Sequence, residues 1–268
     1  MEFSTIELTH ISNAVTLVAR EAGEFIRQER KGFSSIKVEK KGLNDFVSYV
    51  DKGAEKIIVA RLRSLLPQAG FITEEGTEKT DDNPLKWVID PLDGTTNFIH
   101  GMPFFAVSIA LLMNEEPLIG VVYEINQDEM FMAVKDGGAF LNGAAIQVSE
   151  AKTVADSLLG TGFPYYDYHL LDEYLALFKH LMKHSHGIRR PGSAATDLAY
   201  VACGRFDGFY EYSLSPWDVA AGVLLVREAG GIVTDFQGKD EAIFCKQIIA
   251  TNPYVHTEFL NLLRSFMA

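Results

Sequence analysis

Two aspartates three positions apart, Asp90 and Asp93, are the residues of this sequence best placed to do chemistry. Asp90 follows the apolar run 87–89, which predicts a short buried strand, and Pro91 is expected to end the pairing of that strand. After the turn signal at Asp93, the Gly-Thr-Thr segment 94–96 supplies backbone N–H groups that can face an anion. Acids that hold a cation beside amides that hold an anion are what a metal-assisted phosphate site requires.

Other acids stand where they can join this pair. Glu74 and Glu75 end a second predicted strand, and if the two strand ends are neighbours, four carboxylates converge and need bound cations. Asp51 lies beside the apolar stripe of a predicted helix, from which it can reach into a site. Each of these acids also has an ordinary interpretation as a solvated surface or loop charge. For Asp218 the ordinary interpretation is strong, because an acid in the first turn of a helix complements the helix dipole.

The predicted elements that must position these residues alternate along the chain. Predicted helices cover about 5–30, 44–66 (with Asp45 as a cap), 170–183, 194–202, 215–229 and 254–266. Predicted strands cover 36–42 (a strand or mobile hairpin), 69–73, 87–89, 157–162, 206–210 with Glu211 at its end, 232–234 and 247–251.

The segment 104–150 changes character, since strand-like runs alternate there with turn signals and predict an antiparallel meander. A linker near 149–152 is a candidate boundary. We expect an N-terminal α+β subdomain over 1–150, which carries most of the candidate metal ligands. A C-terminal α/β subdomain over 151–268 would carry Asp218 and the residues that choose the substrate.

The bulk composition limits the classes of function. The 268 residues carry a formal net charge of -12, which argues against general binding to nucleic acids or anionic membranes. No apolar stretch reaches transmembrane length, and the first residues do not resemble a signal peptide. Cys203 and Cys245 are far apart and are expected to be free thiols, with a disulfide as the less favoured alternative. We expect a cytoplasmic protein without membrane or direct nucleic-acid binding.

Three motifs stand in order along the chain: FITEE at 71–75, WVIDPLDGTTNF at 87–98, and WDVAAG at 217–222 with EAGG at 228–231. Together they resemble the inositol monophosphatase family of Mg²⁺-dependent, lithium-inhibited sugar phosphatases. The resemblance runs from about residue 5 to residue 266, and RPGSAA at 190–195 and GRFDG at 204–208 resemble its bacterial branch. It implies an α+β fold, a layered αβαβα sandwich with antiparallel and mixed sheets, and a homodimer.

The resemblance also implies a metal site made of oxygen ligands. It assigns Glu74, Asp90 and the backbone carbonyl of Leu92 to a first Mg²⁺, and Asp90, Asp93 and Asp218 to a second. A third, weaker ion would share Glu74 with waters. Oxygen ligands suit Mg²⁺ and exclude a thiolate–zinc site.

The reaction that the resemblance implies is hydrolysis of a phosphate monoester by in-line attack of a metal-activated water, without a covalent enzyme intermediate. Thr95, backed by Asp51, would orient this water and take its proton, with Glu75 behind the metal ligands. The backbone amides of Gly94 and Thr95 and the Thr96 hydroxyl would grip the phosphate.

Substrate choice would lie in the second half of the chain. Glu211 matches the hydroxyl-binding acid of the family, and the backbone of Gly192, Ser193 and Ala194 lines the same pocket. Inositol 1-phosphate and similar small polyol phosphates are the expected substrates. Histidinol phosphate, fructose 1,6-bisphosphate and a nucleotide 3′-phosphate remain alternatives, although Asn97 counts against the last.

Several residues keep weaker or open interpretations. Lys40 matches a mobile-loop lysine of the family. The aromatic run 163–169 borders the expected pocket, and packing is the expected role of its tyrosines, Tyr165 among them. A different class of function also stays open, namely a non-catalytic role in binding the transcription machinery. Three arginines are candidates for a dimer or partner contact in that role: Arg189, Arg190 and Arg205.

Overall fold

The computed structural model describes residues 3–32, 38–42, 45–79, 82–165 and 167–267. Side chains are described for all of these residues except those within 38–48. Its helices are α1 (Thr5–Lys31), α2 (Tyr49–Leu65), α3 (Thr95–His100), the 3₁₀ turn η2 (Val154–Asp156), α4 (Leu171–His184), α5 (Ala194–Ala202), α6 (Pro216–Glu228) and α7 (His256–Met267). The strands of the first half are β1 (Val38–Gly42), β2 (Asp45–Ser48), β3 (Gly70–Thr73), β4 (Leu85–Asp93), β5 (Ala106–Met113), β6 (Glu116–Glu124), β7 (Glu129–Val134), β8 (Gly138–Leu141) and β9 (Ala144–Ala145). Those of the second half are β10 (Leu158–Thr161), β11 (Gly187–Arg189), β12 (Gly208–Tyr212), β13 (Ile232–Thr234) and β14 (Gln247–Thr251).

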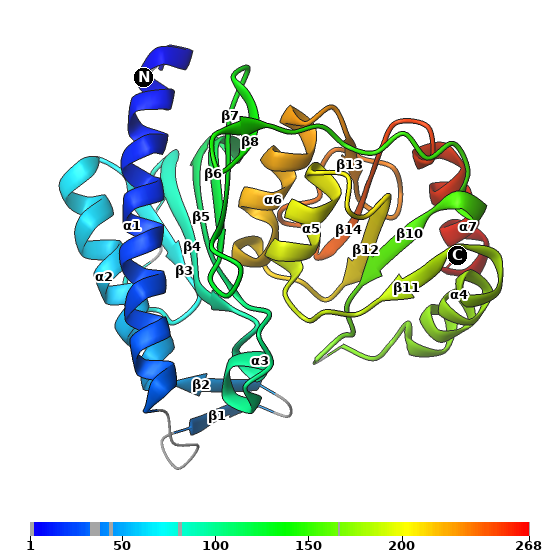
Figure 1. Cartoon of the computed structure of the whole chain (residues 1–268), viewed down its shortest axis with the longest axis horizontal. Helices are drawn as coiled ribbons and strands as arrows, with labels where there is room; N and C mark the ends of the chain where they lie inside the picture. Colours follow the sequence, from blue (N-terminus) through cyan, green and yellow to red (C-terminus); the bar gives the residue numbers. More distant parts are fainter. Residues whose placement is uncertain (1–2, 33–37, 43–44, 80–81, 166, 268) are drawn as a thin grey trace.

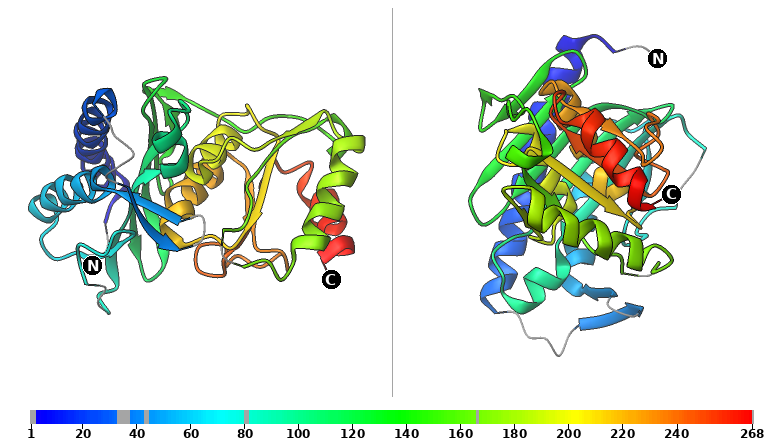
Figure 2. Two further views of the ribbon diagram at one scale, coloured as in Figure 1. Left: turned by 90° about the horizontal axis from the view of Figure 1, so that it is seen from below. Right: turned by 90° about the vertical axis from the view of Figure 1, so that its right-hand side faces the viewer.

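These elements stack in alternating layers of helices and sheets (Figures 1 and 2). The pair α1 and α2 covers the outer face of a sheet of order β3-β4-β5-β6-β7-β8-β9. The pair α5 and α6 lies between that sheet and a second one of order β11-β10-β12-β14-β13, whose far face is covered by α4 and α7. The layered αβαβα sandwich predicted from the sequence is therefore confirmed, whereas the subdomain boundary at residues 150 and 151 stays a prediction.

Both large sheets are mixed. In the first sheet β3 and β4 are parallel and the remaining pairs, from β4 to β9, are antiparallel, which confirms the predicted meander. In the second sheet β10 is parallel to β11 and β12, while β14 is antiparallel to β12 and β13. Parallel β3 and β4 end at the same edge, so the acids that follow them lie side by side.

The central helix α6 explains why two sheets can share one interior. Every residue from Val219 to Val226 is buried, as expected for a helix that is apolar all round and packed on several sides. Two glycines permit this close packing. A Cβ added at Gly120 of β6 would lie 2.6 Å from the carbonyl oxygen of Ala221, and one at Gly222 would lie 2.5 Å from Leu198 of α5. The glycines thus let α6 approach both neighbours.

Two details of the predicted elements are wrong at their ends. The predicted helix 44–66 begins later, at Tyr49, because Asp45–Ser48 forms strand β2 and pairs antiparallel with β1. Asp45 is therefore not a helix cap, since pairing with a distant strand overrides the local helix signal. Strand β12 extends to Tyr212, so Glu211 lies inside the strand and not at its end. The Lys40 side chain lies outside the described part of the chain.

The prediction that Pro91 ends the strand pairing is also wrong. Strand β4 continues to Asp93, and its register against β5 shifts between Asp90, which pairs with Ser108, and Asp93, which pairs with Ala106. Proline is tolerated at such an irregularity because no ladder hydrogen bond needs its missing N–H. The shift carries the chain through the segment that contains both aspartates.

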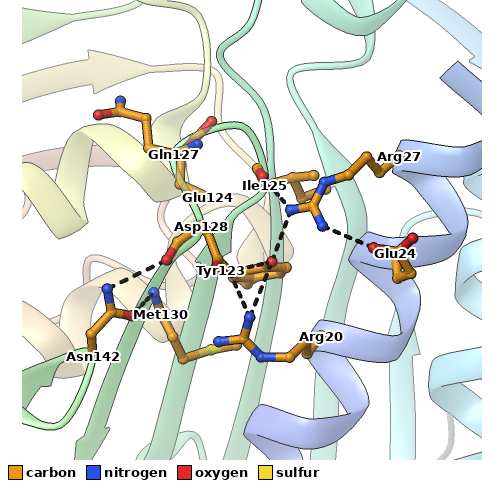
Figure 3. Close-up of polar contacts among 10 residues, drawn as sticks. All are labelled: Arg20, Glu24, Arg27, Tyr123, Glu124, Ile125, Gln127, Asp128, Met130 and Asn142. Atoms are coloured by element: carbon orange, nitrogen blue, oxygen red, sulfur yellow. Dashed lines mark hydrogen bonds and ion pairs between the residues drawn. The ribbon is translucent and has the colours of Figure 1, made fainter. Parts of the chain in front are cut away.

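A polar cluster attaches α1 to the first sheet (Figure 3). The buried Tyr123 of β6 accepts a hydrogen bond from Arg27 Nη2 at 3.1 Å and donates one to Asp128 Oδ1 at 2.7 Å. Arg27 Nη2 also donates to the carbonyl oxygen of Ile125 at 2.7 Å. Arg20 pairs with Asp128 at 2.5 Å, and its Cζ lies 5.1 Å from the centre of the Tyr123 ring. One phenol therefore links two turns of α1 to β6 and the turn that follows it.

We predict that Tyr123→Phe lowers the free energy of unfolding by about 1 kcal/mol, because Arg27 and Asp128 lose the hydroxyl group that they share. Urea denaturation followed by circular dichroism measures the change. Tyr254→Phe is the matched control, since the Tyr254 side chain is 56% exposed. Equal midpoints for Tyr123→Phe and the wild type would show that the cluster contributes nothing.

Candidate metal and substrate site

The candidate site is a cavity of about 340 Å³ that lies where the layers meet. Its lining includes four acids: Glu74, Asp90, Asp93 and Asp218. The ends of β3 and β4 and the N-termini of α3, α5 and α6 supply most of its wall. The sequence expectation that acids from separated strand ends converge is thus met for Glu74, Asp90 and Asp93 but not for Glu75, and the cavity also brings in an acid from the second half of the chain.

Burial is the main cause that raises the pKa values of these acids, and crowding adds to it at Asp90 and Asp218. Burial raises the pKa of Asp90 well above its ordinary value, and the neighbouring charges of Glu74, Asp93 and Asp218 raise it further. Burial is likewise the main cause that raises the pKa of Asp93 to about 6. Burial also raises the pKa of Asp218 to about 7, and the charge of Asp93 is a second cause of this rise. Without a cation, the cluster therefore tends to keep protons.

The path of β4 sets the positions of Asp90 and Asp93. The backbone N–H of Leu92 donates to Asp90 Oδ1 at 2.9 Å across the register shift. Asp93 Oδ2 accepts hydrogen bonds from Ser193 Oγ and from the backbone N–H of Ala195, both at 2.7 Å. Asp93 thus ties the first sheet to the N-terminus of α5, and these hydrogen bonds partly offset the increase in its pKa.

Asp218 takes part in both of the arrangements considered from the sequence. Its Oδ2 accepts a hydrogen bond from the backbone N–H of Ser215 at 2.7 Å and completes a capping box at the start of α6. The same residue lines the cavity beside Asp93. Its capping role is therefore compatible with a place in the site, because the cap engages only one carboxylate oxygen.

Thr95 and Asp51 lie in hydrogen-bond contact. Thr95 Oγ1 is 2.8 Å from Asp51 Oδ1 and 3.0 Å from the carbonyl oxygen of Leu92, and the hydroxyl can donate to either. Asp51 is fully buried on α2, so its carboxylate is shielded from water behind the Thr95 hydroxyl. The structure thus brings together the two residues that the sequence interpretation paired.

The loop that carries Glu74 and Glu75 is anchored by Glu55, a residue that the sequence interpretation missed. The buried Glu55 accepts hydrogen bonds from the backbone N–H of Glu75 at 2.8 Å and from the N–H of Thr77 at 2.9 Å. The Thr77 hydroxyl adds a third at 2.7 Å. The signal for this role was present, because Glu55 lies four positions after Asp51 on the same helix face.

The segment 94–96 begins helix α3 and lines the cavity. Gly94 has a φ of 92°, a left-handed conformation that favours glycine. A Cβ there would also lie 3.2 Å from the carbonyl oxygen of Gly192. Asn97 Nδ2 fixes this approach, since it donates to the carbonyl oxygens of Phe104 at 2.7 Å and Pro191 at 2.9 Å. Asn97 therefore holds the two halves of the site together.

Glu211 also lines the cavity. It is 5% exposed, and burial raises the pKa of its carboxyl well above the ordinary value, with the positive charge of Arg190 opposing that rise. Gly162, which the sequence interpretation missed, makes room for it. A Cβ at Gly162 would lie 2.0 Å from the Glu211 carboxylate, so a larger residue would displace the acid.

Three further residues of this wall were not among the predicted site residues. Arg190, a candidate for a dimer or partner contact, lines the cavity. Tyr165, from the aromatic run expected to border the pocket, lines it too. Arg190 Nη2 donates to the Tyr165 hydroxyl at 2.9 Å. Asp197 of α5 completes this wall. Of the other two arginines, Arg189 is exposed, and Arg205 forms two hydrogen bonds of 2.5 Å with Glu129.

The structure brings all but one of the expected site residues to the cavity wall or into contact with a lining residue. The expected residues in the wall are Glu74, Asp90, Leu92, Asp93, Gly94, Thr95, Thr96, Gly192, Ser193, Ala194, Glu211 and Asp218. Asp51 contacts the wall through Thr95, and Glu75 does not line the cavity but lies next to Glu74 in the chain. Their individual roles stay predictions.

The donor set fits a metal ion in its chemistry, although its side chains stand apart. Among the described residues, no three acid, histidine or cysteine side chains are arranged closely enough to hold one ion as they stand. The four acids nevertheless share one cavity with the carbonyl of Leu92, and all of these donors are oxygens. Such donors fit Mg²⁺, and a bound cation would offset the repulsion that separates the acids.

Comparison with known proteins gives a consistent result. The model of the inositol monophosphatase family matches residues 7–267. The chain is 44% identical over 253 residues to the Nus factor SuhB of Escherichia coli, covering 94% of this chain and 95% of that protein. The crystal structure of the extragenic suppressor protein suhB from Bartonella henselae has a TM-score of 0.89 at 42% identity, covering 94% and 97% of the two chains. The inositol monophosphatase of Anabaena has a TM-score of 0.83 at 37% identity, covering 96% of each chain.

We predict that the melting temperature of the metal-free protein falls by at least about 5 °C between about pH 5 and about pH 8. Unfolded aspartates lose their protons near pH 4, whereas folded Asp93 and Asp218 keep theirs to about 6 and about 7. Unfolding therefore releases protons across this range, and rising pH favours it.

Scanning fluorimetry in EDTA and in Mg²⁺ measures this effect. Because Mg²⁺ binds the ionised acids, its stabilisation should be larger at the higher pH. Asp218→Asn should show a smaller fall in EDTA and a smaller gain with Mg²⁺. A metal-free melting temperature with the same pH dependence in Asp218→Asn and the wild type would contradict the prediction.

Proposed function

The chain belongs to the inositol monophosphatase family, and on that premise we propose that it is a Mg²⁺-dependent phosphomonoesterase acting on inositol 1-phosphate and similar small polyol phosphates. One observation carries the proposal. Glu74, Asp90, Asp93 and Asp218 line the same cavity as the 94–96 backbone at the start of α3. Cation-binding and phosphate-binding groups thus face one volume.

The residues that would hold the metal are those whose oxygens line the cavity. Glu74, Asp90 and the carbonyl of Leu92 would bind a first Mg²⁺, and Asp90, Asp93 and Asp218 a second. A third ion would share Glu74. When bound, Mg²⁺ supplies a lowered pKa for water and offsets the negative charge that develops during phosphate transfer.

Thr95 and Asp51 are suited to move the proton of the attacking water. When the Thr95 hydroxyl donates to Asp51 over 2.8 Å, Oγ1 can accept a proton from water and pass its own to Asp51 Oδ1. In this proposal the water would attack in line with the leaving group, without any covalent enzyme intermediate. Glu75 would support the metal ligands from behind.

The phosphate and the alcohol part of the substrate would be held by different walls. The amides of Gly94 and Thr95 and the Thr96 hydroxyl would bind the phosphate oxygens, because a helix N-terminus favours anions. Glu211 would bind a hydroxyl of the alcohol part, next to the backbone of 192–194. The same proposal includes a homodimer, inhibition by Li⁺ and a cytoplasmic location. Among the helices of the described residues, none has the length and apolar character of a membrane span.

Phosphate release from a substrate panel tests this function. The panel contains inositol 1-phosphate, fructose 1,6-bisphosphate, histidinol phosphate and 3′-phosphoadenosine 5′-phosphate, each with Mg²⁺, with EDTA and with added Li⁺. We expect turnover that requires Mg²⁺, decreases with Li⁺ and is fastest on inositol 1-phosphate. Faster turnover of another substrate would change the substrate class, and release that persists in EDTA would contradict the metal site.

We predict that Asp90→Asn lowers kcat at least ~10²-fold, because it weakens a ligand shared by both proposed ions. Steady-state kinetics at saturating Mg²⁺ measure the loss. Asp240→Asn is the matched control, since the Asp240 side chain is 78% exposed and contacts Arg227 away from the cavity. Near-normal turnover by Asp90→Asn would rule out the proposed two-ion site.

A second candidate function is a non-catalytic role in binding the transcription machinery. It is favoured by the name Nus factor that several relatives carry. A variant with Asp90→Asn and Asp93→Asn would lack catalysis by the proposed mechanism. If this variant still rescues the phenotype of a deletion strain and recovers transcription proteins in a pull-down, the role is independent of catalysis. Loss of rescue despite normal folding would favour the phosphatase.

A further inference from the structure

Two buried polar atoms at the Glu211 end of the cavity lack a hydrogen-bond partner. They are Arg190 Nε, a donor, and Asp197 Oδ1, an acceptor, and neither is paired with any described residue. Asp197 is 1% exposed, and both residues line the cavity together with Glu211. Buried polar groups are nearly always paired, so two unpaired atoms in one cavity wall require an explanation.

Arg190 is held in place by its other contacts. Its Nη2 donates to the Tyr165 hydroxyl at 2.9 Å, and its Cζ lies 5.1 Å from the centre of the Phe163 ring and 5.8 Å from that of Tyr165. On the opposite side, a Cβ at Gly192 would lie 2.8 Å from Nη1. These contacts immobilise the guanidinium, so Nε is not free to move to another partner.

Arg190 and Asp197 do not satisfy each other. Their charges interact, but they form no ion pair within the described part of the chain. The ligand must supply an acceptor for Nε and a donor for Oδ1. An ammonium group can only donate, and a phosphate dianion can only accept. A hydroxyl group does both.

We infer that Arg190 and Asp197 form a second hydroxyl-binding subsite beside Glu211. The site therefore selects a phosphate monoester whose carbon frame carries at least two free hydroxyls, one for Glu211 and one for this pair. This inference rests on the proposed function and narrows its substrate class, and it disfavours substrates that present an ammonium group, such as histidinol phosphate.

The test compares two esters with the same ring, inositol 1-phosphate and cyclohexyl phosphate, which lacks the other hydroxyls. The readout is the ratio of their kcat/KM values. We expect Asp197→Ala to lower this ratio at least about ten-fold, because an acceptor for a substrate hydroxyl is removed. Asp197→Asn should recover part of the loss, since its Oδ1 can still accept. Asp235→Ala removes another buried acid, one that binds backbone N–H groups away from the cavity, and should keep the wild-type ratio.

The outcomes separate this inference from the proposed function. If Asp197→Ala keeps the wild-type ratio while the enzyme remains Mg²⁺-dependent, the subsite is overturned and the phosphatase stands. If the wild type hydrolyses neither ester, the proposed function fails. Calorimetric binding of inositol 1-phosphate then decides the subsite, since at least about ten-fold weaker binding to Asp197→Ala supports it. The subsite is overturned if Asp197→Ala and the wild type bind inositol 1-phosphate with equal affinity, or if the wild type does not bind it.

Discussion

The convergence of four carboxylates on one cavity is the constraint that the surrounding structure has to meet. Asp90 is buried and its pKa is raised by burial and by the charges of Glu74, Asp93 and Asp218. Such a cluster persists only if the backbone holds each acid against repulsion. Accordingly, Asp90 is bonded by the Leu92 N–H, Asp93 by the start of α5 and Asp218 by the start of α6.

These anchors also explain the layered architecture around the site. Helices α5 and α6 lie between the two sheets, and their N-termini both open into the cavity. Helix dipoles favour negative charge at these ends, so the same helices that fill the interior also stabilise the acids. The first sheet contributes through the register shift of β4, and Asn97 connects that region to the segment before α5. The site thus depends on contacts between the two halves of the chain.

Two groups of cavity-lining residues differ in chemistry. The first group consists of acids and the amides of α3, which suit cations and phosphate. The second combines Glu211 and Asp197 with Arg190, a mixture of acceptors and a donor that suits hydroxyl groups. Gly162 and Gly192 leave room for this second group because side chains at those positions would collide with Glu211 and Arg190. The proposed function thus gives reaction and selection to separate groups of residues.

The sequence alone determined the features that depend on local order. The buried strand that leads to Asp90, the paired acids after β3 and the alternation of helices and strands were all predictable, because apolar periodicity and turn residues act over a few positions. The family motifs extended this to Asp218, which no local pattern could connect to Asp90.

Tertiary structure alone decided the features that depend on distant partners. Strand β2 forms because β1 pairs with it, and β4 passes through Pro91 because β5 accommodates a shifted register. Arg190 and Asp197 lie outside the acidic motifs, and no local pattern predicted that either would bind a ligand. Their place in the cavity follows from the packing of α5 between the two sheets, an interaction over distances that sequence patterns do not record.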